Sequence, residues 1–170
     1  LIISTAMSSL NEIHETVNFI LDSDPDIIKE GRLGILQCVA MYGVPKDEYA
    51  NLRVINTLAK NFPDAVIGYS DHTLGSHACN IAVGMGARIL EIHFTDDKTR
   101  DFRDHHLSID KHEMMELVRN IRKTEVLLGS PIKVPVDAIE SKDRIKEFRR
   151  ACYLKRSLSA GELVTANDLN

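Results

Sequence analysis

The sequence predicts an α/β fold in which short parallel strands alternate with helices. Four short apolar runs start about 20–35 residues apart, which is the spacing of a βα unit. The runs are apolar on both faces, as expected for parallel strands that helices cover. They are Leu1–Thr5, Leu33–Val39, Ala65–Ser70 and Ala87–Phe94.

A helical pattern follows each run, with apolar residues recurring at three- and four-residue spacing. Two of these helices are expected to begin with a capping box, because Ser9 precedes Glu12 and Asp110 precedes Glu113 by three residues. The expected helical segments are Ser9–Leu21, Asn51–Phe62, Ser76–Gly84 and Asp110–Leu128.

The order of elements is β-α repeated four times, which suits half of a (β/α)₈ barrel or a small doubly wound sheet. No GxGxxG follows an expected strand, so a dinucleotide-binding fold has no support. We expect a half barrel over residues 1–131, a charged linker over 132–156 and the start of a further domain, with a short β-like element, over 157–170. The chain begins within an expected strand and without Met, which indicates a fragment of a longer protein.

Composition and charge argue against several classes of function. The net charge is −4, and no basic stripe is interleaved with aromatic residues, so nucleic-acid binding is not expected. No apolar run approaches the roughly 18 residues of a membrane span. The three cysteines lack CxxC spacing, which favours a reducing compartment such as the cytoplasm. Cys38, within an apolar run, is expected to be a small core residue.

Polar residues gather where the apolar runs end. In a parallel α/β barrel the carboxyl ends of the strands share one face, and that face carries the active site. We therefore expect residues that are far apart in sequence to converge there. The polar positions are Ser4 and Thr5, Tyr42, Ser70–Thr73 and Glu91–Thr95.

His72 and His93 form the sharpest pair among these residues. Each is expected at a strand end beside a carboxylate, and neighbouring strands lie about 4.8 Å apart. Two imidazoles can hold a transition metal and leave positions for substrate oxygens and water. The alternative is a pair of partly buried, hydrogen-bonded histidines, because HxH and HExxH spacings are absent.

The segment Thr95–Ser108 is a long polar loop that contains Asp104, His105 and His106. Loops that follow strands often carry substrate contacts. The alternative is a solvated loop rich in charge.

Several motifs make the sequence resemble the N-acetylneuraminate (sialic acid) synthase family, which includes legionaminate and pseudaminate synthases. The family carries SDHT, then E-x-HFT about twenty residues later, then a D-H pair before a helix start. The matching segments are Ser70–Thr73, Glu91–Thr95, Asp104–His105 and Ser108–Glu113, with Ile2–Met7, Leu36–Pro45 and Asn51–Arg53 before them and Arg149–Leu169 after them.

The resemblance implies strands five to eight of a (β/α)₈ barrel followed by the start of a small antifreeze-like (SAF) domain. It implies a synthase that condenses phosphoenolpyruvate with the open-chain aldehyde of an N-acetylated aminosugar, giving a nine-carbon 2-keto acid and phosphate. A divalent cation, Mn²⁺ first and Mg²⁺ or Co²⁺ otherwise, would bind His72 and His93. Ser4 and Ser70 would contact phosphoenolpyruvate.

By the same resemblance Tyr42 and Asp104 would contact the sugar, and Glu91 would serve as an acid/base or supporting group. The full-length protein would be a domain-swapped homodimer, and this chain alone would be inactive because the family's strands one to four carry a catalytic Glu and Lys. Departures from the family pattern leave open a non-catalytic protein that binds a metal or a sugar phosphate. They are Ala6, Ala40, Ile92 and Arg103.

Overall fold

The chain forms two compact units, Leu1–Gly129 and Ser130–Asn170. The computed structural model describes residues 1–41, 46–101 and 103–170. In these residues no helix is long and apolar enough to cross a membrane.

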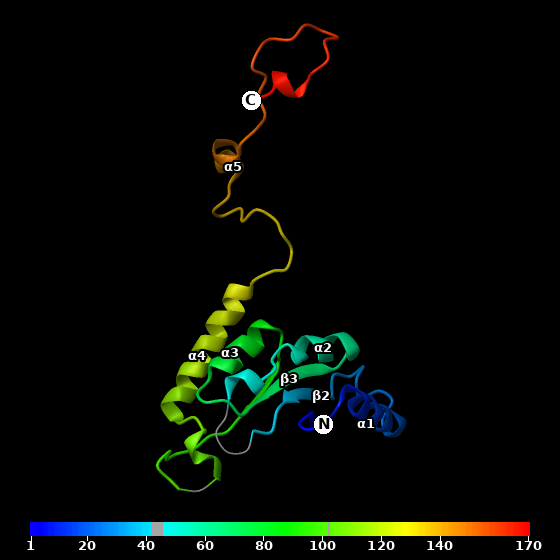
Figure 1. The fold of residues 1–170 in the computed structure, drawn as a ribbon, viewed down its shortest axis with the longest axis vertical. Coiled ribbons are helices and arrows are strands. Elements are labelled where there is room, and N and C mark those ends of the chain that lie inside the picture. The colour runs from blue at the N-terminus through cyan, green and yellow to red at the C-terminus, as the bar shows by residue number, and fades with distance from the viewer. Residues whose placement is uncertain (42–45, 102) are drawn as a thin grey trace. The chain divides into compact units, whose positions relative to one another are not determined.

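Unit 1 is built on a four-stranded parallel sheet with the strand order β1-β2-β3-β4 (Figure 1). The α/β prediction is therefore confirmed, and each strand lies within or next to its predicted apolar run. The strands are β1 Ile2–Ser4, β2 Gly34–Cys38, β3 Val66–Asp71 and β4 Ile89–Ile92.

Four helices follow the strands in turn, as the periodicity predicts. Both predicted capping boxes are present, at Ser9–Glu12 and at Asp110–Glu113. The second helix starts later than predicted, because Asn51 has φ +47° and a left-handed residue cannot begin a right-handed helix. The helices are α1 Leu10–Ser23, α2 Val54–Asn61, α3 His77–Gly84 and α4 Lys111–Leu128.

The helices bury one face of the sheet and form the core with it. Strand residues such as Ile35, Ile67 and Tyr69 pack there in one cluster with helix residues such as Leu58 and Leu117. On the opposite face, Ile2, Ser4 and Glu91 are exposed. The two faces thus differ in character: one holds the apolar core, and the other presents polar groups near the strand ends.

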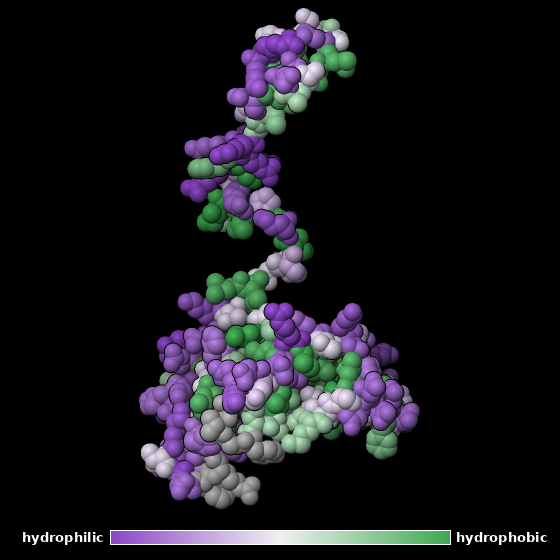
Figure 2. Space-filling model, viewed as in Figure 1, coloured by the Kyte–Doolittle hydropathy of each residue, from purple (hydrophilic) through white to green (hydrophobic). Residues whose placement is uncertain are grey.

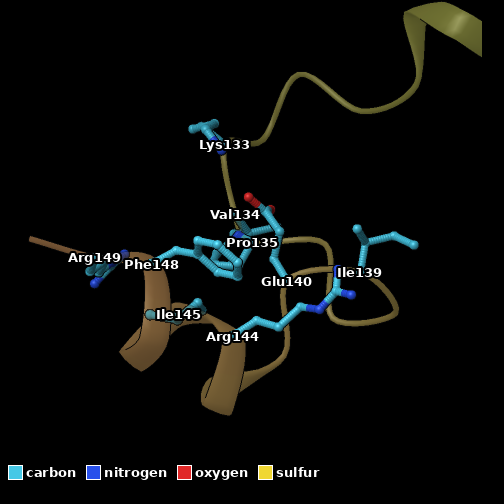
Figure 3. A pocket seen from close by; sticks show the side chains of 9 residues that line it. All are labelled: Lys133, Val134, Pro135, Ile139, Glu140, Arg144, Ile145, Phe148 and Arg149. Atoms are coloured by element: carbon cyan, nitrogen blue, oxygen red, sulfur yellow. The ribbon is translucent and has the colours of Figure 1, made fainter.

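Unit 2 has little interior of its own. It contains α5 Lys142–Phe148 and a 3₁₀ turn at Ala166–Asp168, and Asp168 is its only buried residue. Apolar side chains therefore stay at the surface (Figure 2), where several of them line a hollow of about 500 Å³ beside α5 (Figure 3). Its lining includes Val134, Ile139, Ile145 and Phe148.

The second unit differs from the sequence-based expectation in two places. The segment expected to be a linker contains α5. The β-like element expected at the start of residues 157–170 forms no strand in this fully described unit. Instead, an antiparallel bridge joins Leu154 to Leu169, and the Asp168 carboxylate accepts hydrogen bonds from Arg156 and Thr165.

A glycine in β3 is required by close packing on the open face. A Cβ at Gly68 would lie 2.6 Å from the carbonyl oxygen of Ile89 and would collide with the Leu36 side chain. Gly68→Ala should therefore destabilise the protein by about 1–3 kcal/mol through overpacking. Gly84→Ala is the matched control, because no atom lies within 4 Å of its added Cβ and Ala suits a helix better than Gly. Urea unfolding of the full-length variants compares them, and equal midpoints would contradict this account.

Candidate active site

The register of the sheet aligns polar residues at the carboxyl ends of the strands. Cys38 pairs with Ser70, and Ser70 pairs with Glu91. Because side chains alternate between faces along each strand, these paired residues project to the same side, opposite the helices. Ser70 Oγ donates a 2.6 Å hydrogen bond to Glu91 Oε1. Two residues predicted as site residues are thus in direct contact.

His72 and His93 face each other just beyond this row. Their ring centroids are 5.0 Å apart, with the planes inclined by 74°. A metal–nitrogen bond of about 2.1 Å puts a ring centroid roughly 3.2 Å from the ion. If the nitrogen–metal–nitrogen angle is about 90–110°, the two ring centroids lie about 4.5–5.2 Å apart. The observed separation fits two imidazoles that share one cation.

Besides the histidine pair, a metal site needs further ligating side chains or space for small molecules. Among the described residues, no group of three or more His, Cys, Asp or Glu side chains could hold a metal. A hollow of about 140 Å³ adjoins His93, enough for a few water molecules at about 30 Å³ each. Its lining is Ser70, Asp71, Glu91, Ile92 and His93.

Asp71 points to the opposite, helix-covered side of β3 and is only 2% exposed. Its Oδ1 accepts hydrogen bonds from Tyr69 Oη (3.1 Å) and from the backbone N and Oγ1 of Thr73 (2.8 Å each). Its Oδ2 accepts from Cys79 Sγ on α3 (3.2 Å). Burial, and then the Asp71 charge, raise the pKa values of Tyr69 and Cys79, so both keep their protons and donate.

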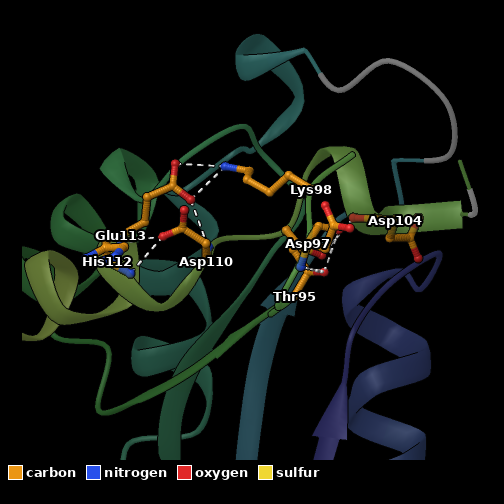
Figure 4. A network of polar contacts seen from close by, with 8 residues as sticks. Thr95, Asp97, Lys98, Asp104, Asp110, His112 and Glu113 are labelled. Carbon is orange, nitrogen blue, oxygen red and sulfur yellow. Dashed lines mark hydrogen bonds and ion pairs between the residues drawn. The ribbon is translucent and has the colours of Figure 1, made fainter. Parts of the chain in front are cut away.

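The loop after β4 is held by polar contacts within it and by one contact to α4 (Figure 4). Thr95 Oγ1 lies 2.7 Å from His105 Nδ1 and accepts from the backbone N of Asp97. Lys98 Nζ pairs with Glu113 Oε2 at 2.6 Å, and this ion pair lowers the pKa of Glu113. The loop is therefore fixed to the first turn of α4.

The remaining predicted site residues are Ser4, Asp104 and Tyr42. Ser4, at the end of β1, is exposed and pairs with Leu36, so it lies on the open face two strands away from Ser70 and one row below it. Asp104 is exposed in the loop, and its backbone carbonyl accepts from Ser108 N and Oγ (3.0 and 2.7 Å). Tyr42 lies outside the described residues.

Sequence reasoning missed one neighbour of the pair. Cys38 is buried, as predicted, but its Sγ lies 3.8 Å from His72 Nδ1. Reasoning also missed the partners of Asp71. The alternation within β3 could have placed Tyr69 beside Asp71, whereas no local signal identifies Cys79, which comes from the following helix.

Comparison with known proteins gives the chain its relatives. N,N'-diacetyllegionaminic acid synthase of Legionella pneumophila is 38% identical over 99% of this chain and 46% of its own length. Human N-acetylneuraminate-9-phosphate synthase is 38% identical over 78% of this chain and 35% of its own length. The crystal structure of N-acetylneuraminic acid (sialic acid) synthetase of Leptospira borgpetersenii, in complex with citrate, matches with a TM-score of 0.75 and 29% identity, over 88% of this chain and 50% of that one. The chain thus spans about half the length of such relatives or less.

Fold and site together define an α/β protein whose polar centre lies at the carboxyl ends of parallel strands, the usual place of an active site in such folds. The NeuB family model matches residues 1–133, which is most of the chain. The chain therefore belongs to the NeuB family, whose members here are sialic-acid-type synthases. A non-catalytic binding protein is not favoured, because these relatives are named as synthases.

Proposed function

We propose that the protein containing this chain is a sialic-acid-type synthase. It joins phosphoenolpyruvate to the open-chain aldehyde of an N-acetylated aminosugar, either N-acetylmannosamine or a related 2,4-diacetamido sugar. The observation that carries the proposal is the facing pair His72 and His93 beside the Ser70–Glu91 hydrogen bond, in a chain of the NeuB family.

In this proposal the four strands are the second half of a (β/α)₈ barrel. The parallel strands follow one another in sequence order, and helices cover only one face, which suits a barrel wall. The first half would supply the family's Glu and Lys, unit 2 would lead into a SAF domain, and the whole would be a cytoplasmic, domain-swapped dimer.

His72 and His93 would hold the divalent cation, with Mn²⁺ as the first candidate. When bound, such a cation supplies Lewis-acid polarisation of the aldehyde carbonyl. Both histidines come from the ends of adjacent strands, so the rigid sheet sets their separation. Positions held by strands are more precise than positions on loops.

The chain's own residues would bind and orient the two substrates. Ser4 and Ser70 would contact phosphoenolpyruvate, and Tyr42 and Asp104 would hold the sugar. A bond forms between the methylene carbon of phosphoenolpyruvate and the aldehyde carbon, water adds at C2, and the C–O bond to phosphate then breaks. Glu91, which accepts a hydrogen bond from Ser70, would hold or accept a proton during these steps.

The first test is an activity assay on the full-length protein. With Mn²⁺, phosphoenolpyruvate and N-acetylmannosamine or a 2,4-diacetamido sugar, the protein should release phosphate and form a 2-keto acid. His72→Ala should lose this activity, whereas Cys152→Ala, at an exposed position in unit 2, should keep it. Absence of phosphate release with every aminosugar of this class would refute the proposal.

The second test concerns the cation alone. Calorimetric titration should show Mn²⁺ binding to the wild-type protein and none measurable to His72→Ala or His93→Ala. Unchanged affinity in His72→Ala would remove the histidine pair from the metal site.

The third test concerns Asp104 and the sugar. Asp104→Asn keeps the size of the side chain but removes its charge, and charged hydrogen bonds contribute about 1.5–3 kcal/mol each. We expect kcat/KM for the sugar to fall roughly ten- to a hundredfold, at 1.4 kcal/mol per decade, with little change for phosphoenolpyruvate. Steady-state kinetics with each substrate varied in turn measures both constants. Wild-type sugar kinetics would mean that Asp104 is only a solvated loop residue.

A further inference from the structure

The structure shows a thiol against the ring of one predicted metal ligand. Cys38 Sγ lies 3.8 Å from His72 Nδ1, and Cys38 is only 6% exposed. Cys38 projects to the same side of the sheet as Ser70, which is the side of the histidine pair. The sulfur is therefore within hydrogen-bonding reach of this ring nitrogen.

A neutral imidazole carries one proton, and the partner of one nitrogen decides which nitrogen keeps it. An Nδ1–H that donates to Cys38 leaves the lone pair of His72 on Nε2. Metal-binding histidines usually have such a partner for the second nitrogen, which fixes both the tautomer and the ring orientation. The His93 ring, inclined at 74°, limits rotation of His72 from another side.

The backbone next to His72 is held from the other face of the sheet. Asp71 accepts four hydrogen bonds, and their donors come from β3, from the turn after it and from α3. Hydrogen bonds to Asp71 therefore hold the backbone directly before and after His72 against the core. A buried carboxylate is costly unless its hydrogen bonds are satisfied, and here each oxygen has at least one donor.

We propose that Cys38 and Asp71 are positioning residues for His72. Cys38 Sγ accepts a hydrogen bond from His72 Nδ1–H, which leaves Nε2 free to bind the cation. Asp71 fixes the backbone from which the ring projects. The part that concerns the cation rests on the proposed function, whereas the tautomer of His72 does not. The competing explanation is that both residues only pack the strand end.

The cation readout uses Mn²⁺ titration of the full-length protein. Loss of a partner behind a metal ligand typically lowers affinity about 10–100-fold, and we expect such a loss in Cys38→Ala. Cys38→Ser should recover much of it, because a hydroxyl oxygen also accepts a hydrogen bond. Cys152→Ala is the matched control and should bind as the wild type does. Equal affinity in Cys38→Ala and the wild type would overturn the role of Cys38.

The tautomer readout needs no metal and separates this inference from the proposed function. Long-range ¹H–¹⁵N spectra of histidine-labelled, metal-free protein should show His72 with its proton on Nδ1. Cys38→Ala should lose this preference, and Cys38→Ser should keep it. If the wild-type protein binds no Mn²⁺, the metal proposal fails, while these spectra still decide the role of Cys38. An unchanged tautomer in Cys38→Ala overturns it.

The role of Asp71 is tested by two variants of different severity. Asp71→Asn replaces the acceptor and should lower Mn²⁺ affinity, with its fold checked by circular dichroism. Cys79→Ala removes one of the four donors and should lower affinity less. Both are compared under conditions in which thermal unfolding shows the variant to be fully folded. If Cys79→Ala, and Asp71→Asn wherever it folds, lose stability but bind Mn²⁺ as tightly as the wild type, Asp71 is only structural and the inference is wrong.

Discussion

The parallel register of the sheet is the constraint on which the site depends. Ser70 lies between Cys38 and Glu91 because β3 pairs with both neighbours in one register. A slip of one residue turns every side chain of a strand to the other face. Such a slip in β4 would point Glu91 and His93 at the helices and bring Leu90 or Ile92 to the open face. The apolar pattern that packs the partly buried Leu90 and Ile92 against the core therefore also sets the face on which Glu91 and His93 lie.

The two faces of β3 make different contacts at the carboxyl end of the strand. Toward the helices, Tyr69 and Asp71 are buried and bonded to one another. Toward the open face, Ser70 donates a hydrogen bond to Glu91 on β4, and the His72 ring lies against Cys38 on β2. The same alternation that makes a strand amphipathic thus separates Tyr69 and Asp71 from Ser70 and His72.

The sequence predicts features that depend on local pattern or on topology. Apolar runs locate the strands, capping boxes locate two helix starts, and parallel order implies that the residues around Ser70 and His93 meet at one edge. The late start of α2 could not be predicted, because the residues around Asn51 do not show that its backbone is left-handed. Nor does the spacing of residues predict that Ser4 lies two strands from Ser70 and one row below it, since only the register sets that distance.

The three cysteines show why the contacts around the histidine pair are harder to predict than the pair itself. By composition they are equivalent and indicate only a reducing compartment. In the structure Cys38 lies against a histidine ring, Cys79 donates to a buried carboxylate, and Cys152 is exposed. A histidine pair at two strand ends can be read from the sequence because topology brings it together. The partner of each ring nitrogen depends on register and side-chain rotation, and these are settled only when the core packs. The sequence therefore indicates which residues meet at the strand ends, whereas the hydrogen-bond partners of those residues become clear only in the folded structure.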